Sequence, residues 1–356
     1  MHDLRPIIVL LGILALVAVG AVMYLLQSIL LPFVIAVFLS FLFKPVVEGL
    51  RKRRIPTFVA LIIVILVVAA VLAGLSMVVV GSVNAFIDAI PRYEGRMTAL
   101  VQEVTRIVER AAEALGLDPG SVRLSDAVSV GSVTSVLSSS LGSLISTLGN
   151  GFLILLFMIF ILAGAGDFSR KIRRAFPSPG ADHASEVIES IDDRVRKYMF
   201  AKMLISLLTG TVTAVILVIL GVDFALLWGF LAFLLNFIPN FGSLIATVFP
   251  VLIALLQFEG PGRAVLAFIL LVVAQNAIGN FLEPKLMAFR FQLSPLLILV
   301  SLIFWGWLWG VWGMILAVPI MSTFKIVCEQ VNVLKPVAVL MSGPPPKEKT
   351  ESWEGG

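Results

Sequence analysis

The stretch Asp223–Gln257 carries no charged side chain between its ends, and the segment Asn236–Gly242 interrupts it near the middle. A second uncharged stretch, Phe291–Thr323, is interrupted at Trp305–Gly313. A helix needs about 20 apolar residues to cross a bilayer, so each stretch is too long for one straight crossing and too short for two. Two shorter helices joined by a bend fit this length, provided that protein or a cavity covers the bend. Paired interruptions of this kind indicate a transporter.

The composition excludes an ordinary soluble domain, because hydrophobic residues make up 59% of the 356 positions and charged residues only 13%. The net charge is a modest +4 and the basic residues lie beside apolar runs, so we do not expect a nucleic-acid partner. Cys328 is the single cysteine, and His2 and His183 lie in hydrophilic stretches. We therefore expect no metal site, no cofactor and no enzymatic activity. No nucleotide-binding glycine loop is apparent, which favours facilitated or gradient-driven transport over an ATP-driven pump.

Six further apolar runs predict full membrane crossings. The first run is predicted to be a retained helix rather than a secretory signal, because a second apolar run follows it almost at once. With the two broken stretches they make eight apolar segments. The predicted fold is an all-α polytopic membrane protein with about six full transmembrane helices and two re-entrant, broken helical hairpins. The six runs are 7–26, 29–43, 57–81, 151–165, 204–222 and 265–281.

Basic loops set the predicted orientation, because short loops rich in Lys and Arg stay in the cytoplasm. The segments 51–54 and 170–174 are such loops, which places both chain termini inside. Two topologies remain open for the broken stretches, since each stretch either crosses once or is re-entrant. The re-entrant scheme is preferred because it keeps Lys285 and Arg290 in the cytoplasm. It also gives a helix plus hairpin at 204–257 and a second one of opposite orientation at 265–323, which is an inverted repeat.

These features divide the chain into five predicted parts. A polar, amphipathic helical insert is expected outside the membrane, as either a lid or subunit contact or a plain connector. The other parts are N-terminal helices, a fourth helix with a basic linker, a transport core with both hairpins, and a cytoplasmic tail whose end is expected to be disordered. In chain order the parts are 1–81, 82–150 (the insert), 151–202, 203–327 and 328–356.

Four sequence blocks, taken together and in this order, resemble the AI-2E family of bacterial membrane transporters. They are Phe237–Pro250, Asn280–Met287, Ser294-Pro295 and Trp305–Pro319, and the resemblance covers essentially residues 5–330. One departure is Ala288-Phe289, where family members often have a glycine before a basic residue. The resemblance implies an export-type permease of the bacterial cytoplasmic membrane that forms a homo-oligomer, with a pentamer as the suggested assembly. The family name refers to the signal autoinducer-2, whereas other members resemble sodium(lithium)/proton antiporters.

The first bend offers amide and hydroxyl groups to a small polyhydroxylated solute or to an ion, from Asn236, Asn240 and Ser243. Pro239 and Gly242 break the helix there and free backbone groups for binding. Simple bend chemistry is the alternative interpretation. Pro250 follows Gly242 in the first stretch much as Pro319 follows Gly313 in the second.

A polar stripe on the helix after the first hairpin gives further candidates, because Asn276, Asn280 and Glu283 lie at i, i+4 and i+7. Gln275 borders this stripe. An ionisable side chain at membrane depth is a functional candidate and needs a cation, a proton or a basic partner. Lys285 or Arg290 is the partner that the sequence suggests for Glu283. Interhelical hydrogen bonding alone is the alternative role for the two asparagines.

The second bend contains glycines that permit close packing or a hinge, together with four tryptophans. An aromatic wall for a solute and an interfacial aromatic belt are both consistent with this composition. The glycines are Gly306, Gly310 and Gly313, and the tryptophans are Trp305, Trp307, Trp309 and Trp312.

Three functions are consistent with the sequence. The first is an exporter of a small polar organic solute, such as an autoinducer-2-like signal, that works by alternating access. The second is a Na⁺(Li⁺)/H⁺ antiporter that uses Glu283 or Asp223. The third is a non-transporting membrane scaffold, which has no need of buried Asn, Pro and Gly breaks.

Overall fold

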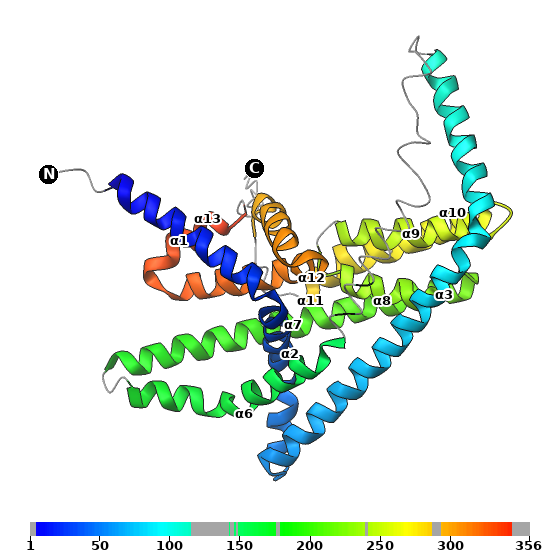
Figure 1. Ribbon diagram of the computed structural model, residues 1–356. Coiled ribbons are helices and arrows are strands. Elements are labelled where there is room, and N and C mark those ends of the chain that lie inside the picture. Colours follow the sequence, from blue (N-terminus) through cyan, green and yellow to red (C-terminus); the bar gives the residue numbers. More distant parts are fainter. Residues whose placement is uncertain are drawn as a thin grey trace, which may run out of the picture.

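The computed structural model describes residues 5–114, 142, 146, 149–175, 179–238, 241–286 and 293–343. In these residues the chain is helical, with one isolated bridge between Leu293 and Ser342. Helices dominate because a backbone in hydrocarbon must pair its own N–H and C=O groups. The helices are α1 (Arg5–Leu25), α2 (Gln27–Lys52), α3 (Thr57–Ala114), α6 (Gly151–Ala175), α7 (Pro179–Leu220), α8 (Ala225–Leu235), α9 (Phe241–Gln257), α10 (Gly262–Asn276), η2 (Ala277–Leu282), α11 (Glu283–Leu286), α12 (Pro295–Gln330), η3 (Asn332–Leu334) and α13 (Lys335–Met341) (Figure 1).

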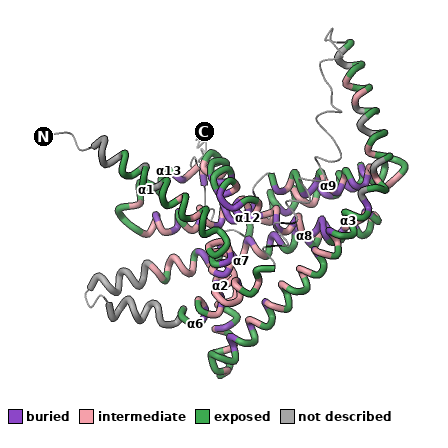
Figure 2. Tube along the Cα trace, in the orientation of Figure 1, coloured by how far each residue is buried: buried purple, intermediate pink, exposed green. Residues whose placement is uncertain are grey.

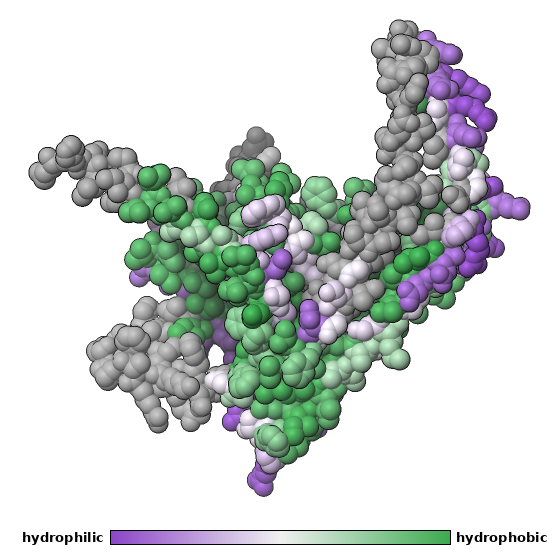
Figure 3. Space-filling view, in the orientation of Figure 1, coloured by the Kyte–Doolittle hydropathy of each residue, from purple (hydrophilic) through white to green (hydrophobic). Residues whose placement is uncertain are grey.

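Five of the described helical segments are long and apolar enough to cross a bilayer, and shorter apolar helices accompany them. Many large apolar side chains lie on the outside of the molecule, such as Leu66, Ile219 and Phe160 (Figures 2 and 3). Such a surface suits contact with acyl chains rather than water. The prediction of an all-α polytopic membrane protein is confirmed. The five segments are 27–52, 57–89, 188–220, 262–286 and 295–330.

The N-terminal helices α2, α3 and α6 pack together around a small apolar core. Ala36, Val64 and Met158 are almost completely buried there, one from each helix. At one end of this bundle, ion pairs join α2 to α7, with Lys44 Nζ at 2.6 Å from Asp192 Oδ2. The N-terminal helices are therefore held to the first half of α7 by charge as well as by packing.

Helices α8 and α9 form the first hairpin, which we call hairpin 1, and its first arm packs closely against α7. A Cβ atom added to Gly210 of α7 would lie 2.6 Å from the Gly229 carbonyl oxygen of α8. A Cβ added to Gly229 would lie 2.6 Å from the Cβ of Ala214. Small residues let two membrane helices approach to backbone contact, where van der Waals packing holds them. Within hairpin 1, a Cβ on Gly242 would overlap the carbonyl oxygen of Leu235.

Helix α12 is interrupted at Trp309 and Gly310, and we call its two arms hairpin 2. Gly310 has φ of 63° and ψ of −143°, which favour glycine. A Cβ on Gly313 would overlap the carbonyl oxygen of Trp305. Residues eight apart are about 12 Å apart along a straight helix, so the chain must fold back at this point. In each hairpin, then, a glycine just after the bend sits against a carbonyl of the incoming arm.

Helix α3 passes through the predicted boundary at residue 81 and continues without a break to Ala114. Pro91 lies inside it, and the helix changes direction in the cyan part of Figure 1. A proline removes one backbone donor and clashes with the preceding turn, which bends a helix without always ending it. The predicted insert therefore begins as an extension of a membrane helix, and Figure 3 shows this extension as a hydrophilic arm.

We expect Gly242→Ala and Gly313→Ala each to lower the midpoint of thermal unfolding in detergent. The added methyl group would overlap a backbone carbonyl, and overpacking of this kind costs about 1–3 kcal/mol. Gly74→Ala is the matched control, because a Cβ at Gly74 meets nothing within 4 Å. Equal midpoints for all three variants would contradict the close packing at the bends.

Candidate functional site

Helix α7 carries a line of buried polar side chains along one face. Along this face, every three or four residues, lie Lys202, Ser206, Thr209 and Thr213. Each residue, backbone included, is at most 5% exposed. This spacing places them on one side of a helix. Polar residues buried at membrane depth are costly and mark functional or interhelical contacts. This polar face was not predicted from the sequence, because Lys202 was assigned to the basic linker before the helix. The spacing of three or four residues between the polar side chains could have indicated it.

The centre of the site is an ion pair between Lys202 of α7 and Glu283 of α11. Lys202 Nζ lies 2.8 Å from Glu283 Oε1, with the lysine side chain 7% exposed and the glutamate 27%. The sequence suggested Lys285 or Arg290 as the partner instead; Lys285 is exposed, and Arg290 lies outside the described residues. A buried charge must be paired or neutralised. Lys202 and Glu283 therefore satisfy each other across two membrane segments.

The bend of hairpin 1 contacts the same face of α7, one turn further on. Asn236 Nδ2 donates to Ser206 Oγ at 2.9 Å. On the other side of Lys202, Tyr198 is hydrogen-bonded to Ser322 of hairpin 2. The two hairpins thus meet α7 on either side of the ion pair. We call Tyr198, Lys202, Ser206, Asn236 and Glu283 the polar cluster.

The remaining candidates at the first bend lie at its edge or outside the described residues. Pro239 and Asn240 are not described. Ser243 is partly exposed, and its carbonyl oxygen accepts a hydrogen bond from Thr247 Oγ1 at 2.9 Å. Pro250 is buried within α9. Of the two predicted polar residues of this bend that the structure describes, Asn236 and Ser243, the first belongs to the cluster through its bond to Ser206.

Asn276 and Asn280 lie on an exposed face of the chain, unlike Glu283. Asn280 Nδ2 donates to Asn276 Oδ1 at 3.0 Å, and Asn276 Nδ2 donates to the Val272 carbonyl oxygen at 2.8 Å. Glu283 lies on a different face from the two asparagines because η2, a π-helical segment, changes the angular register between them. Gln275 is half-buried. The single polar face expected from the spacing is therefore divided in two.

Asp223, the other carboxylate considered for ion exchange, belongs to a clamp at the open end of hairpin 1, away from the bend. Tyr93 of α3 donates to Asp223 Oδ2 at 2.6 Å, and Gln257 Nε2 donates to Asp223 Oδ1 at 3.1 Å. Arg96 also donates to the carbonyl oxygens of Phe258 and Glu259. Burial, followed by the bond to Asp223, raises the pKa of Tyr93, so its hydroxyl stays protonated. We call Tyr93, Asp223 and Gln257 the clamp.

At the second bend the aromatic residues are mostly inside the protein. Trp305, Trp309 and Trp312 are buried, whereas Trp307 is exposed and stacks on Tyr24. Gly306 is half-buried and would meet the Met314 side chain with an added Cβ, while Gly310 and Gly313 form the bend described above. Pro319 is buried in the second arm. Three of the four tryptophans thus pack within the hairpin core rather than in an outer belt.

The polar cluster combines an ammonium, a carboxylate, an amide and hydroxyl groups within an apolar bundle. Such groups can donate to and accept from a hydroxylated solute. In the part of the chain that the structure describes, no group of three or more His, Cys, Asp or Glu side chains is placed to hold a metal ion.

Comparison with known proteins places the chain in a transporter context. The family model described as "AI-2E family transporter" matches residues 13–332. The chain is 30% identical over 344 residues to "AI-2 transport protein TqsA" of Escherichia coli (strain K12), covering 95% of this chain and 98% of that protein. It is 31% identical over 322 residues to a Haemophilus influenzae protein named "Putative transport protein", covering 90% and 92% respectively.

We expect Glu283→Gln to destabilise the protein more than the double variant Lys202→Met/Glu283→Gln. The single change leaves a buried ammonium without its carboxylate; breaking a fully buried pair costs about 3–5 kcal/mol, and the partial exposure of Glu283 puts this pair at or below the lower end of that range. Thermal unfolding of wild type, both single variants and the double variant in detergent measures the coupling. Lys197→Met is the control, because that lysine is 55% exposed and pairs with Asp193 at the surface. Additive effects of the two single changes would refute the buried pair.

Tyr93→Phe should lower stability at neutral and mildly alkaline pH, because it removes a hydrogen bond to a carboxylate worth about 1.5–3 kcal/mol. The raised pKa of Tyr93 keeps this contribution intact below the usual tyrosine pKa of about 10, and it is lost only as the pH rises through the folded value. Tyr24→Phe is the matched control on an exposed tyrosine. If the two variants show the same loss of stability, the hydrogen bond from Tyr93 to Asp223 does not stabilise the folded protein.

Proposed function

This chain belongs to the AI-2E family of transporters, and we propose that it exports a small polar organic solute through the polar cluster. The observation that carries the proposal is the hydrogen bond from Asn236 to Ser206, one helical turn from the Lys202–Glu283 pair. It places the bend of a broken hairpin against buried polar groups, which is where substrate sites of transporters with discontinuous helices are found.

The chemistry of the cluster favours a neutral, hydroxylated solute. Lys202 and Glu283 already neutralise each other, so a charged solute would leave one of them without its partner. An amide at Asn236 and a hydroxyl at Ser206 offer both donors and acceptors to hydroxyl groups. The relative TqsA is named as an AI-2 transport protein. An autoinducer-2-like signal is therefore the solute that we propose to test first.

The proposed mechanism is alternating access, in which the two hairpins move against α7. Hairpin 1 is joined to α7 through Asn236 and Ser206, and hairpin 2 through Ser322 and Tyr198. A solute that takes over the bond between Asn236 and Ser206 would remove the polar contact between the bend of hairpin 1 and this face of α7, and the Gly210–Gly229 packing would remain as the pivot of the movement. We further propose that the broken stretches are re-entrant, that both termini lie in the bacterial cytoplasm, and that the protein works as a homo-oligomer. A solute gradient or an ion gradient would supply the driving force.

The test uses purified protein in liposomes loaded with radiolabelled autoinducer-2 and a trapped pH-sensitive dye. We expect solute efflux with wild-type protein and a loss of about tenfold with Asn236→Leu, because the apolar side chain leaves polar groups of the solute and of Ser206 buried without a partner. Asn84→Leu is the matched control, since Asn84 is exposed on α3. Wild-type efflux no faster than that of protein-free liposomes would contradict export of this solute.

The dye tests the antiporter alternative in the same vesicles. A proton flux that follows addition of Na⁺ or Li⁺, and that Glu283→Gln abolishes, would replace solute export by cation exchange as the function. Absence of both efflux and proton flux would favour the scaffold.

A further inference from the structure

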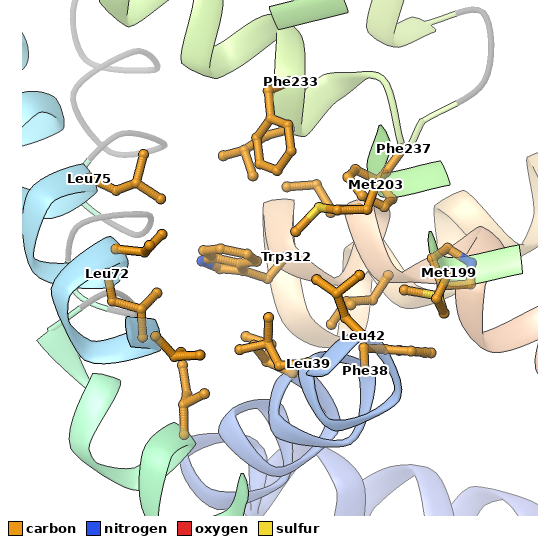
Figure 4. Close-up of a pocket in the computed structure, with 18 of the residues that line it drawn as sticks. Phe38, Leu39, Leu42, Leu72, Leu75, Met199, Met203, Phe233, Phe237 and Trp312 are labelled. Carbon is orange, nitrogen blue, oxygen red and sulfur yellow. The ribbon is translucent and has the colours of Figure 1, made fainter. Parts of the chain in front are cut away.

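An apolar cavity of about 200 Å³ lies between the N-terminal helices and the hairpins (Figure 4). Helices α2, α3 and α6 line it from one side, and α7, α8 and hairpin 2 from the other. Its lining side chains are aliphatic, aromatic or thioether groups, such as Leu72, Met203 and Phe233. The cavity is therefore distinct from the polar cluster, although both border α7.

Trp312 contributes one polar atom to this apolar lining. Its indole Nε1 is buried and has no hydrogen-bond partner among the residues that the structure describes, and the residue is 8% exposed. Figure 4 shows the indole nitrogen on the edge of the ring that faces Leu72 and Leu75. By contrast, Trp228 Nε1 donates to the Asp223 carbonyl and Trp309 Nε1 to the Met23 carbonyl. An unpaired buried donor is costly, so the orphan in the cavity points to a missing acceptor.

Water does not suit this place, because a buried water molecule needs two to four polar partners and the lining residues that the structure describes offer one. A polar solute would lose its hydrogen bonds for the same reason. Apolar cavities of about 150 Å³ bind molecules the size of benzene, so this one has room for a segment of hydrocarbon chain. The chemistry therefore selects an apolar ligand with a single acceptor oxygen.

The cavity also reaches the exposed apolar surface of α3. Val71 lines it and is 52% exposed, and it lies on the apolar part of α3. The neighbouring outward side chains of α3 are apolar too, among them Leu66 and Val67. In a membrane the molecules that cover such a surface are lipids, and their acyl chains have direct access to the opening.

We propose that the cavity binds the acyl chain of a membrane lipid and that the carbonyl oxygen of this chain accepts a hydrogen bond from Trp312 Nε1. The bound chain bridges the N-terminal helices and hairpin 2, so it stabilises one relative position of the two. Lipid binding there regulates the movement of the hairpins without touching the polar cluster. The inference needs only the cavity and the indole, so it holds whichever solute is transported.

The test uses the full chain in nanodiscs that contain phosphatidylethanolamine with a diazirine in one ester-linked acyl chain. After irradiation, mass spectrometry quantifies label on the peptides of α3 and hairpin 2 that line the cavity, relative to label on outward positions of α1. We expect Trp312→Phe to reduce cavity labelling about fivefold, the factor expected from loss of one neutral hydrogen bond. Leu72→Trp should abolish it by filling the space. An ether-linked lipid without the carbonyl should label wild-type protein as weakly as the ester lipid labels Trp312→Phe.

Two matched controls separate this site from general lipid contact. Trp307→Phe makes the same substitution at an exposed tryptophan, and Leu66→Trp makes the same substitution on the outward face of α3. Neither should change cavity labelling, and unchanged thermal midpoints would show that all variants fold. Equal labelling of wild type and Leu72→Trp would overturn the proposal. Loss of labelling in Leu72→Trp but not in Trp312→Phe, or equal labelling by ester and ether lipids, would overturn the hydrogen bond on which it depends.

Discussion

A broken helix inside a bilayer needs protein around its bend, and the rest of this structure is arranged to provide that cover. The bends of both hairpins are closed by a glycine placed against a carbonyl of the incoming arm, Gly242 at Leu235 and Gly313 at Trp305. Hairpin 1 can then lie against α7 because Gly210 and Gly229 remove the side chains between the two helices. These close contacts put Asn236 within hydrogen-bond distance of Ser206.

Hydropathy alone predicted the helical fold and the positions of both interruptions, because a bilayer imposes length and composition directly on the sequence. It did not predict the partner of Glu283, since Lys202 lies 81 residues away and only packing brings the two together. The exposed position of Asn276 and Asn280 was not predictable from a regular spacing, because η2 departs from the α-helical period. The change from apolar to polar composition near residue 81 was visible, but an α-helix has the same backbone in both settings, so α3 continues.

Helix α7 connects the two sites of the molecule. Lys202 and Ser206 belong to the polar cluster, while Met199 and Met203 line the apolar cavity, so the two sets alternate along two turns of one helix. A rotation of α7 about its axis would change both surroundings together. The chain thus places a polar surface and an apolar surface within one helical segment, with hairpin 1 in contact with both.

The bend of α3 has a mechanical consequence. Tyr93 follows Pro91 by two residues, so the clamp attaches hairpin 1 to the corner between the membrane part of α3 and its hydrophilic arm. The arm from Pro91 to Ala114 is roughly 35 Å long at 1.5 Å per residue, and a turn of about 10° at the corner would move its tip by roughly 6 Å. A shift of hairpin 1 too small to resolve at the clamp would therefore appear at the tip of the hydrophilic arm as a displacement that a distance probe can read.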